Sequence, residues 1–136
     1  MGLSAPQIGH SLCIIAYEFK DPQMIKQKRL SPTPLTFIIN PILQMTDRQK
    51  DSQSWVPEYE SCESVPHYNA LVKRASSVKV SGWDLNGNDV DIKADGFLAR
   101  VLQHEMDHLQ GTLYIDKMVH QTLRHDRVCY TENSHF

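Results

Sequence analysis

The sequence predicts an α+β fold in which small mixed or antiparallel β-sheets pack around one central long helix. Three observations predict it. Two short apolar segments near the amino terminus have the composition of buried strands, a later segment alternates around an Asn-Gly pair, and one segment has apolar residues at helical spacing. With 136 residues, 40% hydrophobic and 22% charged, we expect one domain spanning residues 1–136.

The predicted strands come first along the chain. Leu12–Tyr17 and Leu35–Asn40 are apolar and rich in β-branched residues, as buried strands are. Residues 20–34 between them are polar and contain prolines, so we expect a surface loop. A weaker strand follows at residues 42–46, and residues 47–55 are polar and predict another loop. Ser76–Ile92 then alternates and turns at Asn86-Gly87, which predicts an antiparallel hairpin.

The long helix is predicted from Ala94 to Gln110. Its apolar stripe is formed by Phe97, Leu98, Val101, Leu102, Met106 and Leu109. Asp95 is a suitable amino-terminal cap, and Gly111 is a suitable end. Residues 119–136 are polar, so we expect a tail that frays.

Charge and cysteine content exclude several classes of function. A net charge of -2 with scattered basic residues gives no field that favours nucleic acid or membrane as partner. The longest apolar run, Leu12–Tyr17, is too short to span a bilayer. The three cysteines are odd in number and widely spaced, which favours a reducing compartment. We expect Cys13 in the core and Cys129 to be inert.

A possible metal site is formed by His104, Glu105 and His108. Residues at i and i+4 share one face of a helix, so both imidazoles can bind one ion. Glu105 is offset, so its carboxylate can reach a water and accept a proton. The alternative is two buried histidines that bond backbone carbonyls. The His-Glu-x-x-His spacing favours the metal.

A catalytic site of this type needs a third protein ligand and an open position. The candidates are Cys62, His67, Glu60, His120 and His125. Cys62 is preferred because it lies in a Glu- and Ser-rich segment, unlike the apolar surroundings of Cys13. A thiolate binds zinc and ferrous iron well.

Three segments together resemble the peptide deformylases. "GLSAPQ" (Gly2–Gln7) resembles that family's first motif, Gly-x-Gly-Leu-Ala/Ser-Ala-Pro-Gln. "ESCES" (Glu60–Ser64) resembles the second, Glu-Gly-Cys-x-Ser, and "QHEMDHLQG" (Gln103–Gly111) is similar to the third. The order and spacing match. Ser4 and Glu63 look like the animal mitochondrial branch, which implies a mitochondrial protein, or otherwise a cytoplasmic one.

The resemblance implies an enzyme that removes the formyl group from N-formylmethionine of new polypeptides. Cys62, His104 and His108 would hold one divalent metal, Fe²⁺ or Zn²⁺, with Co²⁺ as a substitute. Glu105 would carry a proton from the attacking water to the leaving amine. The Gln7 side-chain amide and the Glu63 backbone N–H would stabilise the oxyanion.

The resemblance also implies how a peptide binds. Gly2 would bond the extended substrate backbone. Phe97 and Val101 would line the methionine pocket, although plain core packing explains them equally well. The implied partners are N-formylmethionyl nascent peptides and the exit region of the ribosome, with no direct binding of nucleic acid or membrane.

Two departures from the family pattern affect these expectations. The first motif starts two residues before Gly2, so we expect a chain truncated at its amino terminus, with exposed apolar surface and an unpaired sheet edge. Ser61 replaces a glycine, which would cost about 1 kcal/mol if that position needs positive φ. A catalytically impaired, metal-stabilised remnant or partner-binding domain is therefore an alternative. A general zinc peptidase is less favoured because it leaves Gln7 and Cys62 unexplained.

Overall fold

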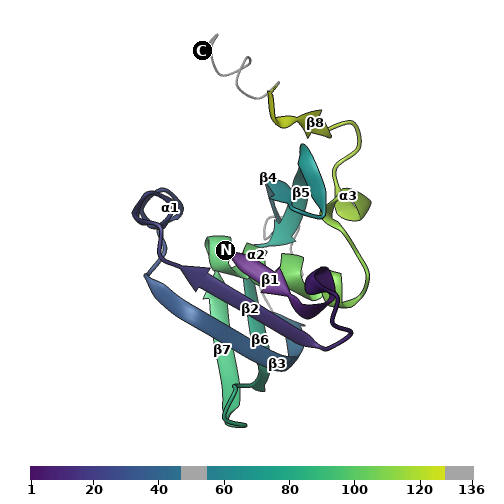
Figure 1. Ribbon diagram of the computed structural model, residues 1–136. Helices are drawn as coiled ribbons and strands as arrows, with labels where there is room; N and C mark the ends of the chain where they lie inside the picture. Colours follow the sequence, from purple (N-terminus) through teal and green to yellow (C-terminus); the bar gives the residue numbers. More distant parts are fainter. Residues whose placement is uncertain (47–54, 128–136) are drawn as a thin grey trace.

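A computed structural model describes residues 1–46 and 55–127, and within them two antiparallel sheets enclose one long helix (Figure 1). The first sheet has the order β1-β2-β3-β6-β7 and the second the order β4-β5-β8. The first contains β1 (Gly2–Ser4), β2 (Ile14–Phe19), β3 (Thr33–Met45), β6 (Ser77–Trp83) and β7 (Asp89–Asp95). The second contains β4 (Trp55–Cys62), β5 (Val65–Ala75) and β8 (Arg124–His125). The predicted α+β class is confirmed.

The central helix, α2, spans Gly96–Leu109. It starts two residues later than predicted, because β7 continues to Asp95. Asp95 holds the N-cap position but its side chain makes no capping hydrogen bond. Gly111, at φ 72°, follows the helix, in the left-handed conformation that glycine favours near helix ends. The shorter helical segments are η1 (Ala5–Ile8), a 3-10 helix, α1 (Pro22–Lys28) and α3 (Tyr114–Lys117).

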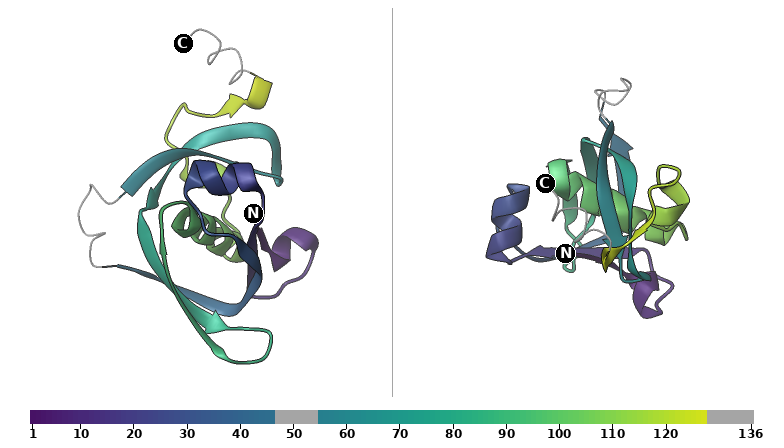
Figure 2. Two further views of the ribbon diagram at one scale, coloured as in Figure 1. Left: turned by 90° about the vertical axis from the view of Figure 1, so that its left-hand side faces the viewer. Right: turned by 90° about the horizontal axis from the view of Figure 1, so that it is seen from above.

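The main core lies between α2 and the inner face of the five-stranded sheet. Its buried members are Ile15, Tyr17, Phe19, Ile38, Ala75, Val78, Val80, Ala94, Ala99 and Leu102. A smaller cluster is formed between β5 and α3 by Ala70, Val72 and Tyr114. The left view of Figure 2 shows α2 surrounded by the two sheets. Side chains of α2 therefore meet residues from both sheets.

The predicted hairpin is confirmed. β6 and β7 pair antiparallel from Ser77 opposite Asp95 to Trp83 opposite Asp89. In the turn, the Asp84 carboxylate accepts hydrogen bonds from the backbone N–H groups of Asn86 and Asn88. The pKa of Asp84 is lowered by these bonds. The turn is therefore stabilised by its own side chain as well as by Gly87.

The two predicted strands before it are also present, but β3 is longer than expected. It joins the segment predicted at residues 35–40 to the weaker segment at 42–46. The pairing with β6 shifts register between Ile39 and Ile42, and Asn40 has φ 49° in between. A β-bulge explains this break, because it lets one strand bend and continue.

The loop prediction for residues 20–34 is wrong in its centre, where α1 forms. The Asp21 carboxylate accepts a hydrogen bond from the Gln23 N–H, and Pro22 occupies the first helical position. Proline there has no N–H to leave unpaired and already has a helical φ. A proline is therefore a helix-start signal here, although in a polar segment it also indicates a loop. The predicted loop at 47–55 falls mainly on residues 47–54, outside the described part.

The structure differs from two further predictions, which concern Cys13 and the segment after residue 118. Cys13 is exposed rather than in the core, because it precedes the first residue of β2 and its side chain does not enter the sheet. The polar segment after residue 118 pairs with β5 through β8, where Arg124 lies opposite Asn69. Residues 128–136, including Cys129, lie outside the described residues.

The face of the first sheet opposite α2 carries exposed apolar side chains. Leu3, Leu35 and Trp83 are 41%, 56% and 46% exposed. Leu3 lies opposite Ala16 in the β1–β2 pair, and Trp83 opposite Ile39 in the β3–β6 pair. β1 is also an edge strand.

Candidate metal centre

The three predicted metal ligands converge at one point. His104 and His108 lie one turn apart on α2, and their Nε2 atoms are 3.2 Å apart. Cys62 Sγ, at the end of β4, is 3.4 Å from His108 Nε2. All three donor atoms lie within 4.8 Å of one another. A thiolate with two imidazoles is a donor set for zinc or ferrous iron, so the residues fit a divalent transition metal.

The β4–β5 hairpin brings Cys62 to the helix. The two strands pair regularly up to Ser61 opposite Asn69, and the register then shifts so that Cys62 lies opposite Val65. Ser61 is exposed, belongs to β4, and is absent from the described non-glycine residues with positive φ. The strain expected from serine at this position therefore does not arise. Glu63 occupies the turn after Cys62.

Glu60 fixes the ring of His104. Glu60 Oε2 is 3.0 Å from His104 Nδ1, so Nδ1–H donates to the carboxylate and Nε2 is left to bind metal. Burial alone would raise the pKa of Glu60, but the hydrogen bonds from Arg74 and His104 outweigh it and lower this pKa to about 2. Burial would lower the pKa of His104, but the bonds to Glu60 and Cys62 raise it to about 9. Both effects favour the charged pair in the metal-free protein.

Two buried arginines hold Glu60 in place. Arg74 bonds both Glu60 oxygens, at 2.9 and 3.0 Å. Arg100 Nη1 donates to Glu60 Oε1 at 2.6 Å and to the Val72 carbonyl at 3.0 Å. The side chains of Arg74, Arg100 and Glu60 are only 3%, 6% and 6% exposed. Such burial is tolerated because each charge is paired and hydrogen-bonded.

Glu105 points into the site and remains partly unpaired. The residue is 4% exposed, and Oε2 is the one buried side-chain oxygen or nitrogen without a hydrogen-bond partner in residues 1–46 and 55–127. Burial raises the pKa of Glu105 to about 7, against the opposing effect of the His104 charge. A carboxyl group whose pKa lies near neutral pH, and which has one oxygen without a hydrogen-bond partner, is suited to accept and return a proton.

Gly2 permits β1 to approach Glu105. A Cβ at Gly2 would lie 2.5 Å from Glu105 Oε1 and 2.8 Å from Val101 Cγ1. Any side chain at this position would therefore collide with the candidate base. The first-motif glycine lies where the sequence places it, beside the site.

Gln7 is oriented by Ser4. The Ser4 N–H and hydroxyl both donate to Gln7 Oε1, each at 2.9 Å, which leaves Nε2 directed at Cys62 Sγ at 3.5 Å. Ser4 is 1% exposed. The Gln7 amide thus presents its donor to the same point as the three metal ligands.

A cleft of about 470 Å³ opens over these groups. Residues of the first and second motifs line it, together with α1 and the start of α2: Gly2, Gln7, Met24, Lys28, Glu63, Phe97, Val101 and Glu105. Phe97 and Val101 both line the cleft and pack against the main core. Lining of a pocket and packing in the core, the two roles considered for these residues, are therefore compatible.

The other candidates for third ligand lie elsewhere. His67 and His125 stack on each other with ring centroids 6.1 Å apart, and His120 is exposed. Glu60 contacts His104 Nδ1 instead of joining the three donor atoms. Sequence reasoning did not assign a role to Ser4, Arg74 or Arg100. Only the three-residue spacing of Ser4 and Gln7 is a signal readable along the chain.

Comparison with known proteins gives one consistent result. Residues 1–124 match the family described as polypeptide deformylase. The chain is 40% identical over 129 residues to the mitochondrial peptide deformylase of Homo sapiens, covering 90% of this chain and 51% of that protein. The chain therefore spans about half the length of this relative.

Solved structures agree with the sequence comparison. The actinonin complex of peptide deformylase from Synechococcus elongatus superposes with a TM-score of 0.71 at 33% identity, covering 88% of this chain and 57% of that one. A Met-Ala-Ser-bound deformylase from Acinetobacter baumannii gives 0.72 at 29% identity, covering 86% and 69%. The chain belongs to the polypeptide deformylase family.

Proposed function

We propose that the protein binds one divalent metal through Cys62, His104 and His108, and hydrolyses the formyl group of N-terminal formylmethionine. The convergence of these three donors with the unpaired Glu105 carboxylate is the observation that carries the proposal. Fe²⁺ and Zn²⁺ both suit the donor set, and Co²⁺ is a chemically similar substitute. When bound, such an ion supplies Lewis acidity to water and to a carbonyl oxygen.

The residues of the chain then divide the work. Water adds to the formyl carbon and loses a proton to Glu105, and the same proton goes to the amine nitrogen as the C–N bond breaks. The products are formate and a free amino terminus. Gln7 Nε2 is held by Ser4 in the direction of the site, and we assign it, with the Glu63 backbone N–H, to the developing oxyanion. Each such donor contributes about 2.7–4 kcal/mol to transition-state stabilisation.

We assign peptide binding to the edge of the first sheet. β1 is an edge strand beside α2, so an extended peptide can add main-chain hydrogen bonds along it. Gly2 keeps this edge close to Glu105. Phe97 and Val101, with Met24 from α1, form an apolar wall of the cleft that suits a methionine side chain. The peptide bound in the Acinetobacter baumannii relative is consistent with this class of substrate.

Formate release separates the proposed activity from its alternatives. The metal-loaded protein is expected to release formate from formyl-Met-Ala and to leave an internal peptide bond intact. Glu105→Gln is expected to keep its metal and to lose about 10²–10⁴ in rate. Cleavage of the internal peptide would favour a general peptidase. Metal binding with no formate release from the wild-type protein would favour a metal-stabilised remnant or partner-binding domain.

The same proposal places the protein in mitochondria, acting on chains that leave the ribosome. Its support is the 40% identity to the human mitochondrial relative. Within the described residues, no helix has the length and apolar character needed to cross a bilayer. Subcellular fractionation tests the compartment, and co-sedimentation with ribosomes tests the second partner. Recovery only outside mitochondria would contradict the localisation.

A further inference from the structure

We propose that Lys117 of α3 is a positioning residue for the metal centre, acting through Asp107, Arg74 and Glu60 on the His104 ring. The inference rests on the proposed metal site. Lys117 touches none of the three ligands. Lys117 lies at one end of a continuous series of ion pairs. The imidazole ring of His104, a proposed metal ligand, lies at the other end.

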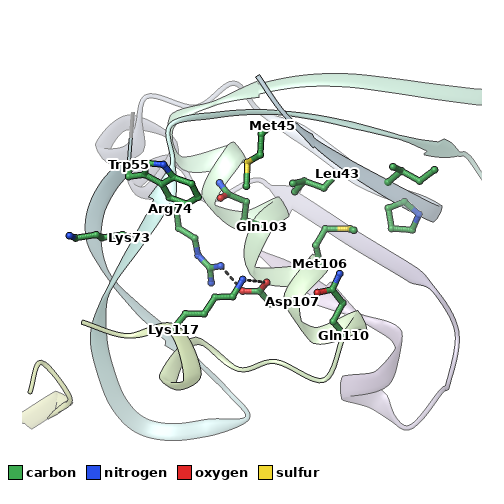
Figure 3. Close-up of a pocket in the computed structure, with 12 residues that line it drawn as sticks. Leu43, Met45, Trp55, Lys73, Arg74, Gln103, Met106, Asp107, Gln110 and Lys117 are labelled. Atoms are coloured by element: carbon green, nitrogen blue, oxygen red, sulfur yellow. Dashed lines mark hydrogen bonds and ion pairs between the residues drawn. The ribbon is translucent and has the colours of Figure 1, made fainter. Parts of the chain in front are cut away.

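The contacts along this series are short and each uses a separate atom. Lys117 Nζ is 2.7 Å from Asp107 Oδ1, and Arg74 Nη1 is 2.5 Å from Asp107 Oδ2. Arg74 then donates to both oxygens of Glu60, and Glu60 Oε2 meets His104 Nδ1 at 3.0 Å. Figure 3 shows the first two of these contacts, with Lys117 and Arg74 converging on Asp107.

Lys117 is the solvent-exposed member of this otherwise buried series of ion pairs. Its side chain is 48% exposed, whereas those of Asp107 and Arg74 are 10% and 3% exposed. All three line a pocket of about 440 Å³ that shares no lining residue with the cleft over the metal centre. The series therefore connects a second surface of the protein to the ligand ring.

The chemistry of Asp107 explains why the lysine matters. With Lys117 present, each carboxylate oxygen has its own cation, and Arg74 keeps its Nε and Nη2 for Glu60. Without the Lys117 ammonium, Asp107 Oδ1 would accept a hydrogen bond from water in the pocket or compete with Glu60 for the donors of Arg74. Either change would weaken the hydrogen bonds between Arg74 and Glu60. A ligand histidine binds metal less tightly when its orienting carboxylate is displaced.

A purely structural role is the competing explanation. Lys117 lies in the last turn of α3, and half-exposed ion pairs contribute little to stability. A structural role would lower stability or leave everything unchanged, without acting on the metal in particular. The test must therefore measure metal affinity and the unfolding of metal-free protein separately.

The experiment compares Lys117→Met, Lys117→Arg and Lys73→Met. Arginine keeps the charge, and Lys73 lines the same pocket without an ion pair in the part of the chain that the structure describes. Zn²⁺ affinity is measured by competition with a chromophoric chelator. The absorption spectrum of the Co²⁺-loaded protein reports ligand geometry. Urea unfolding of the metal-free proteins provides the stability control.

We expect Lys117→Met to lower Zn²⁺ affinity about tenfold, the small end of the range for residues that orient ligands, and to shift the Co²⁺ spectrum. Lys117→Arg should restore most of the affinity, and Lys73→Met should match wild type. Wild-type affinity in Lys117→Met would overturn the inference while leaving the proposed function intact. An equal loss in the Met and Arg variants that tracks metal-free stability would also overturn it. A wild-type protein that binds no metal would refute both proposals.

Discussion

Replacing Gly2 with alanine tests whether β1 presses against the candidate base. The added Cβ would lie 2.5 Å from Glu105 Oε1 and 2.8 Å from Val101 Cγ1, well inside the normal contact distance of about 3.5–4.0 Å. β1 cannot simply retreat, because Gly2, Leu3 and Ser4 all pair with β2. The clash must be relieved mainly by moving Glu105, or by bending the strand.

The magnitude follows from two opposing terms. Forcing one extra methyl group into a packed site costs about 1–3 kcal/mol, and alanine recovers about 0.4–1 kcal/mol by restricting the unfolded chain. The difference between the two terms is a net loss of unfolding free energy of about 0–2.6 kcal/mol, with a midpoint of about 1.3 kcal/mol. The effect on catalysis should be larger, because a displacement of about 1 Å at a reacting group can cost about 10²-fold in rate.

Urea unfolding and formate release measure the two effects on the same protein. Gly87→Ala is the matched control: its φ of 79° strains alanine, but nothing lies within 4 Å of the added Cβ, and it sits in the β6–β7 turn. We expect it to lose about 1–2 kcal/mol of stability and to keep its rate per folded molecule. A Gly2→Ala protein with wild-type stability and rate would refute the close approach and the assignment of Glu105 as base.

Two other perturbations test the charges around the site. Arg74→Met leaves Glu60 and Asp107 without their shared buried cation and should lower the urea-unfolding free energy by about 3–5 kcal/mol; a loss below about 1 kcal/mol would show that the pairs are solvated. In chelator-treated protein, the stabilisation from Glu60 is present above its unfolded-state pKa and lost as pH falls toward about 2. The contributions of His104 and Glu105, whose pKa values are raised to about 9 and about 7, are present at low pH and lost as pH rises through those values. The urea midpoint should therefore peak at about pH 5, and a flat profile to pH 9 would contradict the raised pKa values.

The elements that sequence patterns predicted well are those determined by local periodicity and turn chemistry. The β6–β7 hairpin follows from alternation and from the Asn86-Gly87 turn, and α2 follows from its apolar stripe. The segment at residues 55–62 was different: it became β4, although its acidic and proline-bearing sequence gave no strand signal. Its conformation is set by pairing with β5 across the turn that contains Glu63, and such cross-strand pairing has no signature within the strand itself.

The residues of the candidate site also differ in how far the sequence alone could predict them. His104 and His108 could be placed on one helical face from their spacing, and Cys62 was selected by its unusual surroundings. No role could be assigned to Arg74 or Asp107 from the sequence. Arg74 pairs with Glu60, 14 residues away along the chain, and with Asp107, 33 residues away. A buried arginine in a strand resembles any surface arginine until its acceptors are known.

The burial pattern of α2 is consistent with the proposed chemistry. Most of its buried residues are polar or charged: Arg100, Gln103, Glu105, Asp107 and His108, beside Ala99 and Leu102. Burying such groups is unfavourable unless they are paired. Gln103 is paired through the Ala75 N–H and carbonyl, and Asp107 through Arg74 and Lys117.

Glu105 differs from these neighbours, because Oε2 alone among the buried side-chain polar atoms of the described residues has no partner. The unsatisfied oxygen costs stability, yet a base that must accept a proton from water needs a lone pair that the protein does not already occupy. The surrounding ion pairs hold the ring of His104 through Glu60, and in the proposed mechanism Glu105 is left free to exchange a proton. An amide at this position preserves the packing but cannot accept that proton, so Glu105→Gln removes the function of the unpaired oxygen without removing the metal ligands.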